Sequence, residues 1–229
     1  RMTAANQALT TQMAIEFAPT IEGIAEFLGK KIGFLGQAVS ALSAIGSTKE
    51  GGSMLNELQS STNTYTIVQG SNANSFTVES GILNKMRAFA SQINNDPDPR
   101  QAKTRQGIAS KGIDISGGAG GTITWDPNGF TLPTTSGGVN NPTINLGHEM
   151  FHALDANRGQ LDNRRDSGGI TRKEWQAVYR ENILRGQLNV PLRTHYGTQQ
   201  NQYGHFMKGT GPKMLDSSGK PIKPSWYTP

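Results

Sequence analysis

The strongest hydrophobic pattern in the chain lies between residues 146 and 157. Apolar residues recur there at intervals of three or four positions, as on one face of an α-helix: Leu146, Met150, Phe151 and Leu154. Asn145 or Thr143 can cap the start of this helix, and Gly159 can close its end. A second helix is predicted over residues 171–188, with an apolar face formed by Ala177, Val178, Leu184 and Leu188.

The N-terminal part of the chain is also expected to be helical. Residues 2–46 are rich in Ala, Leu, Ile and Phe and predict two helices that are broken near Pro19 or Gly29. The stretch 32–46 carries no charged side chain, but it is short for a membrane span. A packing helix is therefore the favoured interpretation, and an interfacial or translocation-related segment is the alternative. The polar, glycine-rich residues 48–53 are the best candidate for a domain boundary.

The remaining segments carry shorter patterns. Residues 64–69 and 75–79 flank a Gly-Ser-Asn turn and predict a β-hairpin. Residues 129–142 predict a loop, and the chain after Pro191 predicts an irregular, loosely ordered tail. The other expected elements are a helix over 81–93 and strands over 113–116 and 122–125. Helices and short strands in separate runs are typical of an α+β fold.

The composition excludes several kinds of site. The chain has 229 residues, a net charge of +5 and no cysteine, so a disulfide, a thiolate zinc site and a cysteine nucleophile are excluded. Nine basic residues accompany four acidic ones between residues 158 and 208. A solvated surface is the favoured interpretation, and a docking face for an acidic protein or a nucleic acid is the alternative. Because few aromatic residues accompany these charges and no nucleic-acid motif is present, we expect no nucleic-acid partner.

An HExxH sequence, His148-Glu-Met-Phe-His152, lies on the first predicted helix. Two histidines four residues apart share one face of a helix, so both imidazoles can bind one zinc ion. Glu149 beside them can take a proton from a zinc-bound water and pass it to a leaving amine. The alternative is an ordinary helix with two surface histidines and a solvated glutamate.

A catalytic zinc needs a third protein ligand. A histidine six residues after His152 would indicate a metzincin, but Arg158 occupies that position. Glu174 and Glu181 lie seven residues apart on one face of the second helix, and we predict that Glu174 binds the metal. Glu181 and Asp155 are predicted to hydrogen-bond a ligand or a nearby arginine.

The choice of third ligand leaves alternatives open. Glu181 could bind the metal in place of Glu174, and the other carboxylates considered are Asp155, Asp162 and Asp166. Thr171-Arg-Lys-Glu174 also matches a capping box, in which Glu174 would only close the start of the helix.

Two residues after the second helix are candidates for stabilising the transition state. His195 or Tyr196 could donate a hydrogen bond to the oxyanion that forms when water attacks a carbonyl. Tyr203 and His205 are weaker candidates for the same role. The alternative is that these residues only form a structural turn after Pro191.

Three blocks of the sequence resemble the NleD-like zinc peptidases. His148-Glu-Met-Phe-His-Ala-Leu-Asp-Ala-Asn-Arg-Gly159 resembles their HExxHAxDxxRG block, and Glu174-Trp-Gln-Ala-Val-Tyr-Arg-Glu-Asn182 resembles their second block. Pro191-Leu-Arg-Thr-His-Tyr196 resembles the segment that follows. The family includes type III secretion effectors and toxin domains at the ends of Rhs-type proteins. The resemblance covers about residues 110 to 205 and implies that His148, His152 and Glu149 have the family's zinc-binding and catalytic roles.

We therefore expect an α+β, zincin-like catalytic domain over residues 51–229 with an irregular C-terminal tail. A helical N-terminal region over residues 1–50 would serve as a linker or a packing element. The expected function is a zinc-dependent endopeptidase that a bacterial secretion system delivers into a target cell, where it cleaves a protein. A secretion-system carrier or chaperone is expected as a further partner, and no membrane partner is expected. The alternatives are a zinc amidase acting on peptidoglycan or another non-protein amide, and a metal-free binding module with a degenerate site.

Overall fold

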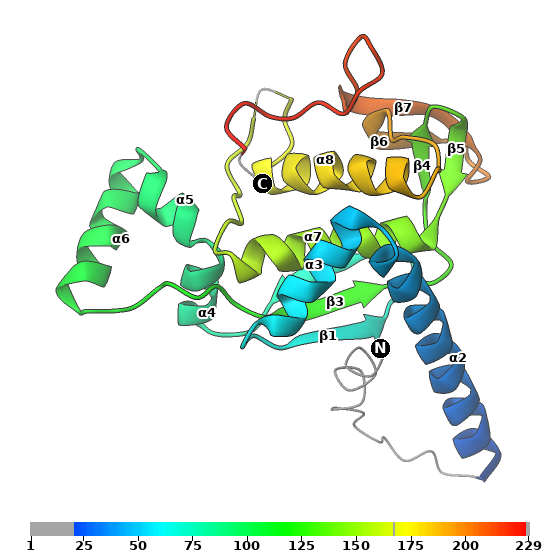
Figure 1. The fold of residues 1–229 in the computed structure, drawn as a ribbon, viewed down its shortest axis with the longest axis horizontal. Helices are drawn as coiled ribbons and strands as arrows, with labels where there is room; N and C mark the ends of the chain where they lie inside the picture. The colour runs from blue at the N-terminus through cyan, green and yellow to red at the C-terminus, as the bar shows by residue number, and fades with distance from the viewer. Residues whose placement is uncertain (1–20, 167, 228–229) are drawn as a thin grey trace.

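The computed structural model describes residues 21–166 and 168–227, and it combines helices with short strands (Figure 1). The helices are α2 (Ile21–Gly46), α3 (Lys49–Ser60), α4 (Ile82–Ala88), α5 (Ala90–Asn95), α6 (Pro99–Ser110), α7 (Pro142–Asn157) and α8 (Arg172–Gln187). The strands are β1 (Tyr65–Gln69), β2 (Ser75–Val78), β3 (Gly121–Trp125), β4 (Thr131–Thr134), β5 (Gly137–Asn140), β6 (His195–Gln200) and β7 (Phe206–Lys213). The predicted α+β class is confirmed.

The largest sheet has three strands in the order β1-β3-β2. β3 is central, parallel to β1 and antiparallel to β2, so the predicted hairpin between β1 and β2 is wrong. The loop between β1 and β2 bonds the end of β3 instead: the Gly70 N–H donates to the Trp125 carbonyl, and the Asn72 N–H donates to the Asp126 carboxylate. The central position of β3 in the sheet agrees with the burial of its alternate side chains, which include Ile123 and Trp125.

The hydrophobic core lies between this sheet and the helices. Figure 1 shows α7 crossing the structure between the sheet and α8, with α3 beside it. Ala38 and Ile45 of α2 and Met54 of α3 belong to the same buried cluster as Ile123 of β3 and Phe151 of α7. The second half of α2 therefore packs on α7, while the division of the chain into domains at residue 50 stays a prediction.

α8 packs closely on α7 at one small residue. A Cβ atom on Gly147 would lie 2.6 Å from Cδ2 of Leu184, so a larger residue there would require the Leu184 side chain to move. Gly147 directly precedes His148, and the close approach brings the side chains of α8 within reach of both histidines.

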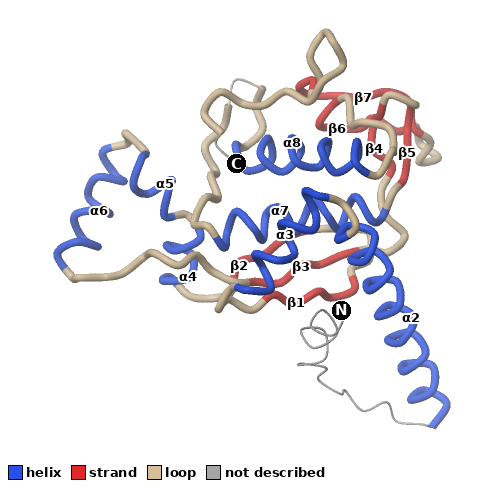
Figure 2. Tube along the Cα trace, in the orientation of Figure 1, coloured by secondary structure: helices blue, strands red, loops and turns tan. Residues whose placement is uncertain are grey.

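Two hairpins, β4–β5 and β6–β7, lie at one end of the α7–α8 pair (Figure 2). Two predictions, a loop over residues 129–142 and an irregular tail after Pro191, are wrong where these strands form. Their sequences, such as Gly-Gly-Val-Asn in β5, are too rich in glycine and polar residues to show alternation. Backbone pairing makes them strands, including the bridge from Thr134 to Arg193 that joins the hairpins.

Several other boundaries differ from expectation. α2 is continuous from Ile21 to Gly46, so it has no break at Gly29, and the predicted helix before Pro19 lies outside the described residues. The predicted helix over 81–93 is divided at Phe89 into α4 and α5. Residues 113–116 form no strand, and α6 was not predicted. None of the described helices combines the length and the apolar character that a membrane-spanning segment requires.

Candidate metal centre

The HExxH residues lie on α7. The helix begins with Pro142, and the side chain of Asn141, rather than that of Asn145 or Thr143, accepts the N-cap hydrogen bond from the Ile144 N–H at 3.1 Å. His148 and His152 then lie one turn apart, with ring centroids 4.9 Å from each other. Their side chains are only 12% and 8% exposed, so the alternative of two surface histidines does not describe this helix.

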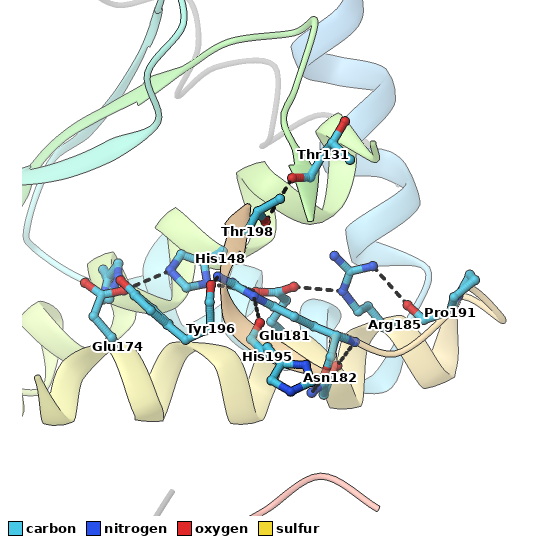
Figure 3. Close-up of polar contacts among 12 residues, drawn as sticks. Thr131, His148, Glu174, Glu181, Asn182, Arg185, Pro191, His195, Tyr196 and Thr198 are labelled. Atoms are coloured by element: carbon cyan, nitrogen blue, oxygen red, sulfur yellow. Dashed lines mark hydrogen bonds and ion pairs between the residues drawn. The ribbon is translucent and has the colours of Figure 1, made fainter. Parts of the chain in front are cut away.

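Glu174 of α8 faces the imidazole of His148 (Figure 3) and also lies beside that of His152. Its Oε2 atom lies 3.3 Å from Nε2 of His148 and 3.4 Å from Nε2 of His152. One ligand atom from each of the three residues lies within 4.8 Å of the others. Ligand atoms about 2.0–2.1 Å from a tetrahedral zinc ion are about 3.3–3.4 Å apart. The His148, His152 and Glu174 donor set therefore fits a zinc ion.

The capping-box alternative for Glu174 does not match the structure. Thr171 is the N-cap residue of α8, but its side chain makes no capping hydrogen bond. The Glu174 carboxylate instead points toward His148 (Figure 3) and lies within 3.4 Å of His152. Glu174 therefore lies in the first turn of α8 but contacts the histidines of α7 instead of closing the start of its own helix.

Glu181 lies behind His148, on the side away from Glu174. Its Oε2 atom is 3.0 Å from Nδ1 of His148. A hydrogen bond at Nδ1 sets the tautomer that leaves the Nε2 lone pair free, as is usual for histidines that bind metals. Arg185 donates to Oε1 of Glu181 at 2.7 Å, and Arg193 donates to Oε2 at 2.8 Å. The fully buried Glu181 therefore lies where it can orient His148, and this role stays a prediction.

The charges of this cluster favour a cation between the histidines and Glu174. Burial disfavours ionised Glu181, but Arg193 and Arg185 outweigh it and hold its pKa well below the usual range. Burial of Glu174 is outweighed by the neighbouring imidazoles, which lower its pKa. Burial also disfavours charged His148, yet its bonds to Glu174 and Glu181 raise its pKa to about 10. The two carboxylates are thus ionised at neutral pH and attract a positive charge, which is a proton on His148 or a metal ion that displaces this proton.

Tyr196 belongs to this cluster, whereas His195 does not. Burial, together with the charge of Glu174 and a hydrogen bond to it, raises the pKa of the Tyr196 phenol. The side chain of His195 leaves β6 in another direction, because neighbouring strand residues point to opposite faces (Figure 3). Its ring lies against Gly209 of β7, and its Nδ1 atom is 3.1 Å from Oγ1 of Thr194.

Glu149 is also buried beside the cluster. Its side chain is on α7 and the residue is 8% exposed. Its negative charge contributes to the raised pKa of His148 and of Tyr196, so the carboxylate lies near both. This position next to the candidate ligands suits the predicted role of a general base.

The other carboxylates considered as ligands lie elsewhere among the described residues. Asp155 faces Arg180, with Oδ1 and the guanidinium 3.5 Å apart, and burial raises its pKa to about 6. Asp162 binds Arg164, and Asp166 accepts a hydrogen bond from the indole of Trp226. The prediction that Asp155 bonds an arginine agrees with this geometry.

The weaker candidates Tyr203 and His205 also lie away from the cluster. They pack on each other near the turn between β6 and β7, with ring centroids 6.3 Å apart. Tyr203 is 74% exposed, and no contact joins either side chain to the candidate metal ligands among the described residues.

Three buried basic residues on or after α8 were missed by the sequence interpretation. Arg180, Arg185 and Arg193 were expected on a solvated surface, but they are 3%, 0% and 6% exposed. Arg193 connects α8 to β6, because it donates to Glu181 and to the backbone carbonyls of His195 and Tyr196. The spacing of Arg185, four residues after Glu181, was the one signal in the sequence that could have paired them.

The fold and the cluster define a class: α+β proteins in which two packed helices carry a candidate His-His-Glu metal centre. Residues 26–196 match the family model Peptidase_M91, which is described as an effector protein. The chain therefore belongs to this peptidase-type effector family, which is the NleD-like family that the three sequence blocks resemble. No curated protein and no solved structure matches the chain.

Proposed function

We propose that the protein is a zinc-dependent endopeptidase that cleaves a protein of a target cell. The observation that carries this proposal is the position of Glu174 Oε2, which lies 3.3 Å from Nε2 of His148 and 3.4 Å from Nε2 of His152, about the separation of two ligands of a tetrahedral zinc ion. Membership of a peptidase-type effector family supports the reaction class. Delivery by a bacterial secretion system, with a carrier or chaperone as an additional partner, is part of the same proposal.

Each residue of the cluster has a separate role in the proposed reaction. His148, His152 and Glu174 hold the ion, and Glu181 fixes the His148 ring through Nδ1. Zinc, when bound, acts as a Lewis acid that polarises a water molecule and the scissile carbonyl. Glu149 accepts the proton of the attacking water and passes it to the leaving amine. The Tyr196 phenol donates a hydrogen bond to the carbonyl oxygen as negative charge develops there.

Metal removal tests the proposed reaction. We expect the purified protein to cleave members of an unstructured peptide library, to lose this activity after treatment with a chelator, and to regain it when zinc is restored. Mass spectrometry of the peptides before and after each step measures the result. Hydrolysis of peptidoglycan without cleavage of any peptide would contradict the endopeptidase proposal and favour an amidase. Zinc content near zero after dialysis against zinc-containing buffer would contradict both.

Tyr196→Phe tests the role of the phenol. Because the variant loses one donor to the developing oxyanion, we expect kcat to fall about 100- to 1,000-fold with little change in KM. His195→Ala is the matched control, since the His195 ring lies against Gly209, and its kcat should stay near that of the unaltered protein. Steady-state kinetics on one cleaved peptide measure both. Equal losses in the two variants would contradict the assignment.

A further inference from the structure

A buried arginine between α8 and β6 contacts both sides of the candidate site. Arg193 is 6% exposed, and each of its three guanidinium nitrogens donates a hydrogen bond to a different residue. Nη1 donates to Oε2 of Glu181 at 2.8 Å, Nε donates to the backbone carbonyl of His195 at 3.2 Å, and Nη2 donates to that of Tyr196. The guanidinium also lies over the Tyr196 ring, 5.1 Å from its centroid.

The backbone of Arg193 is bound to α8 as well. The Arg193 N–H donates to Oδ1 of Asn182 at 2.7 Å, and Nδ2 of Asn182 donates to the Arg193 carbonyl at 3.0 Å. Asn182 is 1% exposed and follows Glu181 in the same helix. Both the main chain and the side chain of Arg193 are therefore held by α8, the helix that also carries Glu174.

Arg185 resembles Arg193 in its contact with Glu181 but not in its other contacts. It is fully buried and donates to the other carboxylate oxygen of Glu181, Oε1, at 2.7 Å. It also donates to the backbone carbonyl of Pro191 at 3.0 Å, and no contact in the described part of the chain joins it to Tyr196. Two arginines thus compensate the charge of Glu181, but only Arg193 also binds the residue that carries the phenol.

We propose that Arg193 is a positioning residue that fixes the Tyr196 phenol relative to the His148 ring. Oε2 of Glu181 accepts from Arg193 and also lies 3.0 Å from Nδ1 of His148. One carboxylate oxygen and one guanidinium therefore join the imidazole to Tyr196. The planar guanidinium holds its three acceptors in fixed directions, which the single ammonium of a lysine cannot do. This role rests on the proposed function, in which the phenol donates to the developing oxyanion.

Arg193→Lys tests this role because it keeps a positive charge beside Glu181 and removes the three-way hydrogen bonding. We expect kcat at saturating zinc to fall about 10- to 100-fold, since a misplacement of about 1 Å at a reacting group can cost about 100-fold. When Tyr196→Phe is already present, the same substitution should lower kcat less than about threefold, because no phenol remains to be positioned. Steady-state kinetics on one cleaved peptide measure the four proteins of this double-mutant cycle.

Arg185→Lys is the matched control for Arg193→Lys. It makes the same chemical change at the second buried partner of Glu181, which has no contact with Tyr196. Its effect on kcat should therefore be the same with and without Tyr196→Phe. Zinc analysis by atomic emission verifies that each variant is fully loaded, so that a change in kcat does not reflect lost metal.

The position of the Tyr196 ring is measured separately, in zinc-free protein. The chain has five tyrosines, so carbon-13 labelling of tyrosine gives few ring signals in an NMR spectrum, and Tyr196→Phe identifies the signal of Tyr196. We expect Arg193→Lys to shift this signal, because the ring loses the guanidinium that lies over it, and Arg185→Lys to leave it in place. Arg193→Gln, which keeps an N–H donor without the charge, should shift it too and replaces the lysine variant if that protein does not fold.

Two results would overturn the proposal. One is an additive effect of Arg193→Lys and Tyr196→Phe on kcat, and the other is an equal change of the Tyr196 signal in the two lysine variants. Failure of the proposed function gives a different result. If the unaltered protein cleaves no peptide, the peptidase reaction is wrong, while the Tyr196 signal still decides whether Arg193 fixes the ring.

Discussion

Glu149→Gln is expected to lower kcat about 100- to 10,000-fold while leaving the zinc content of the protein unchanged. Glutamine has nearly the same shape as glutamate, but it cannot accept the proton that the attacking water must lose. Glu149 is 8% exposed and its charge acts on both His148 and Tyr196, so it belongs to the buried cluster of the proposed site. The loss should therefore lie in kcat, with the metal site intact.

Peptide cleavage rates together with zinc analysis by atomic emission measure this effect. Glu149→Ala should behave in the same way. Glu79→Gln is the control, because it makes the same chemical change at an exposed position after β2 and should leave both quantities unchanged. A Glu149→Gln variant that keeps at least half of the activity would rule out Glu149 as the general base.

Glu174→Ala is expected to abolish tight zinc binding. The substitution removes the only carboxylate in the described structure whose oxygen faces Nε2 of both His148 and His152. Loss of a residue that merely orients a ligand typically costs about 10- to 100-fold in metal affinity, so removal of the ligand itself should cost more than about 100-fold. Competition with a chromophoric chelator measures the dissociation constant of each variant.

Glu181→Gln is the informative comparison for Glu174→Ala. Its zinc affinity should fall by only about 10- to 100-fold, because glutamine can still accept a hydrogen bond from His148. Its folding stability should fall by about 3–5 kcal/mol, since buried Arg185 and Arg193 lose their charged partner. If Glu174→Ala binds zinc normally while Glu181→Gln does not, the assignment of the third ligand is wrong.

The two helices of the site could be predicted because the signals for a helix, its apolar spacing and its end residues, lie within the segment itself. Apolar spacing placed a helix at Leu146 to Asn157, and the structure begins it four residues earlier, at Pro142. The expected second helix over residues 171–188 agrees with α8, Arg172–Gln187, within a residue at each end. Gly159 has a φ of 67°, a left-handed conformation that suits its predicted place after the helix.

The strands were harder to predict because their pairing joins distant segments. The turn signal between β1 and β2 is a local feature, and it could not show that β3, some fifty residues later, would lie between them. β6 and β7 contain few apolar residues and are held by backbone hydrogen bonds to each other, so the sequence carries no alternation for them.

The sequence by itself determined that two histidines and a glutamate lie within about one turn of the same helix. Residues four positions apart on an α-helix share one face, so the two imidazoles lie side by side. It also limited the third ligand to a few carboxylates. The close approach of α7 and α8 at Gly147 decided that Glu174 faces both imidazoles and that Glu181 lies behind His148. Tertiary structure likewise decided that Tyr196 rather than His195 faces the cluster, since the direction of a strand side chain depends on register.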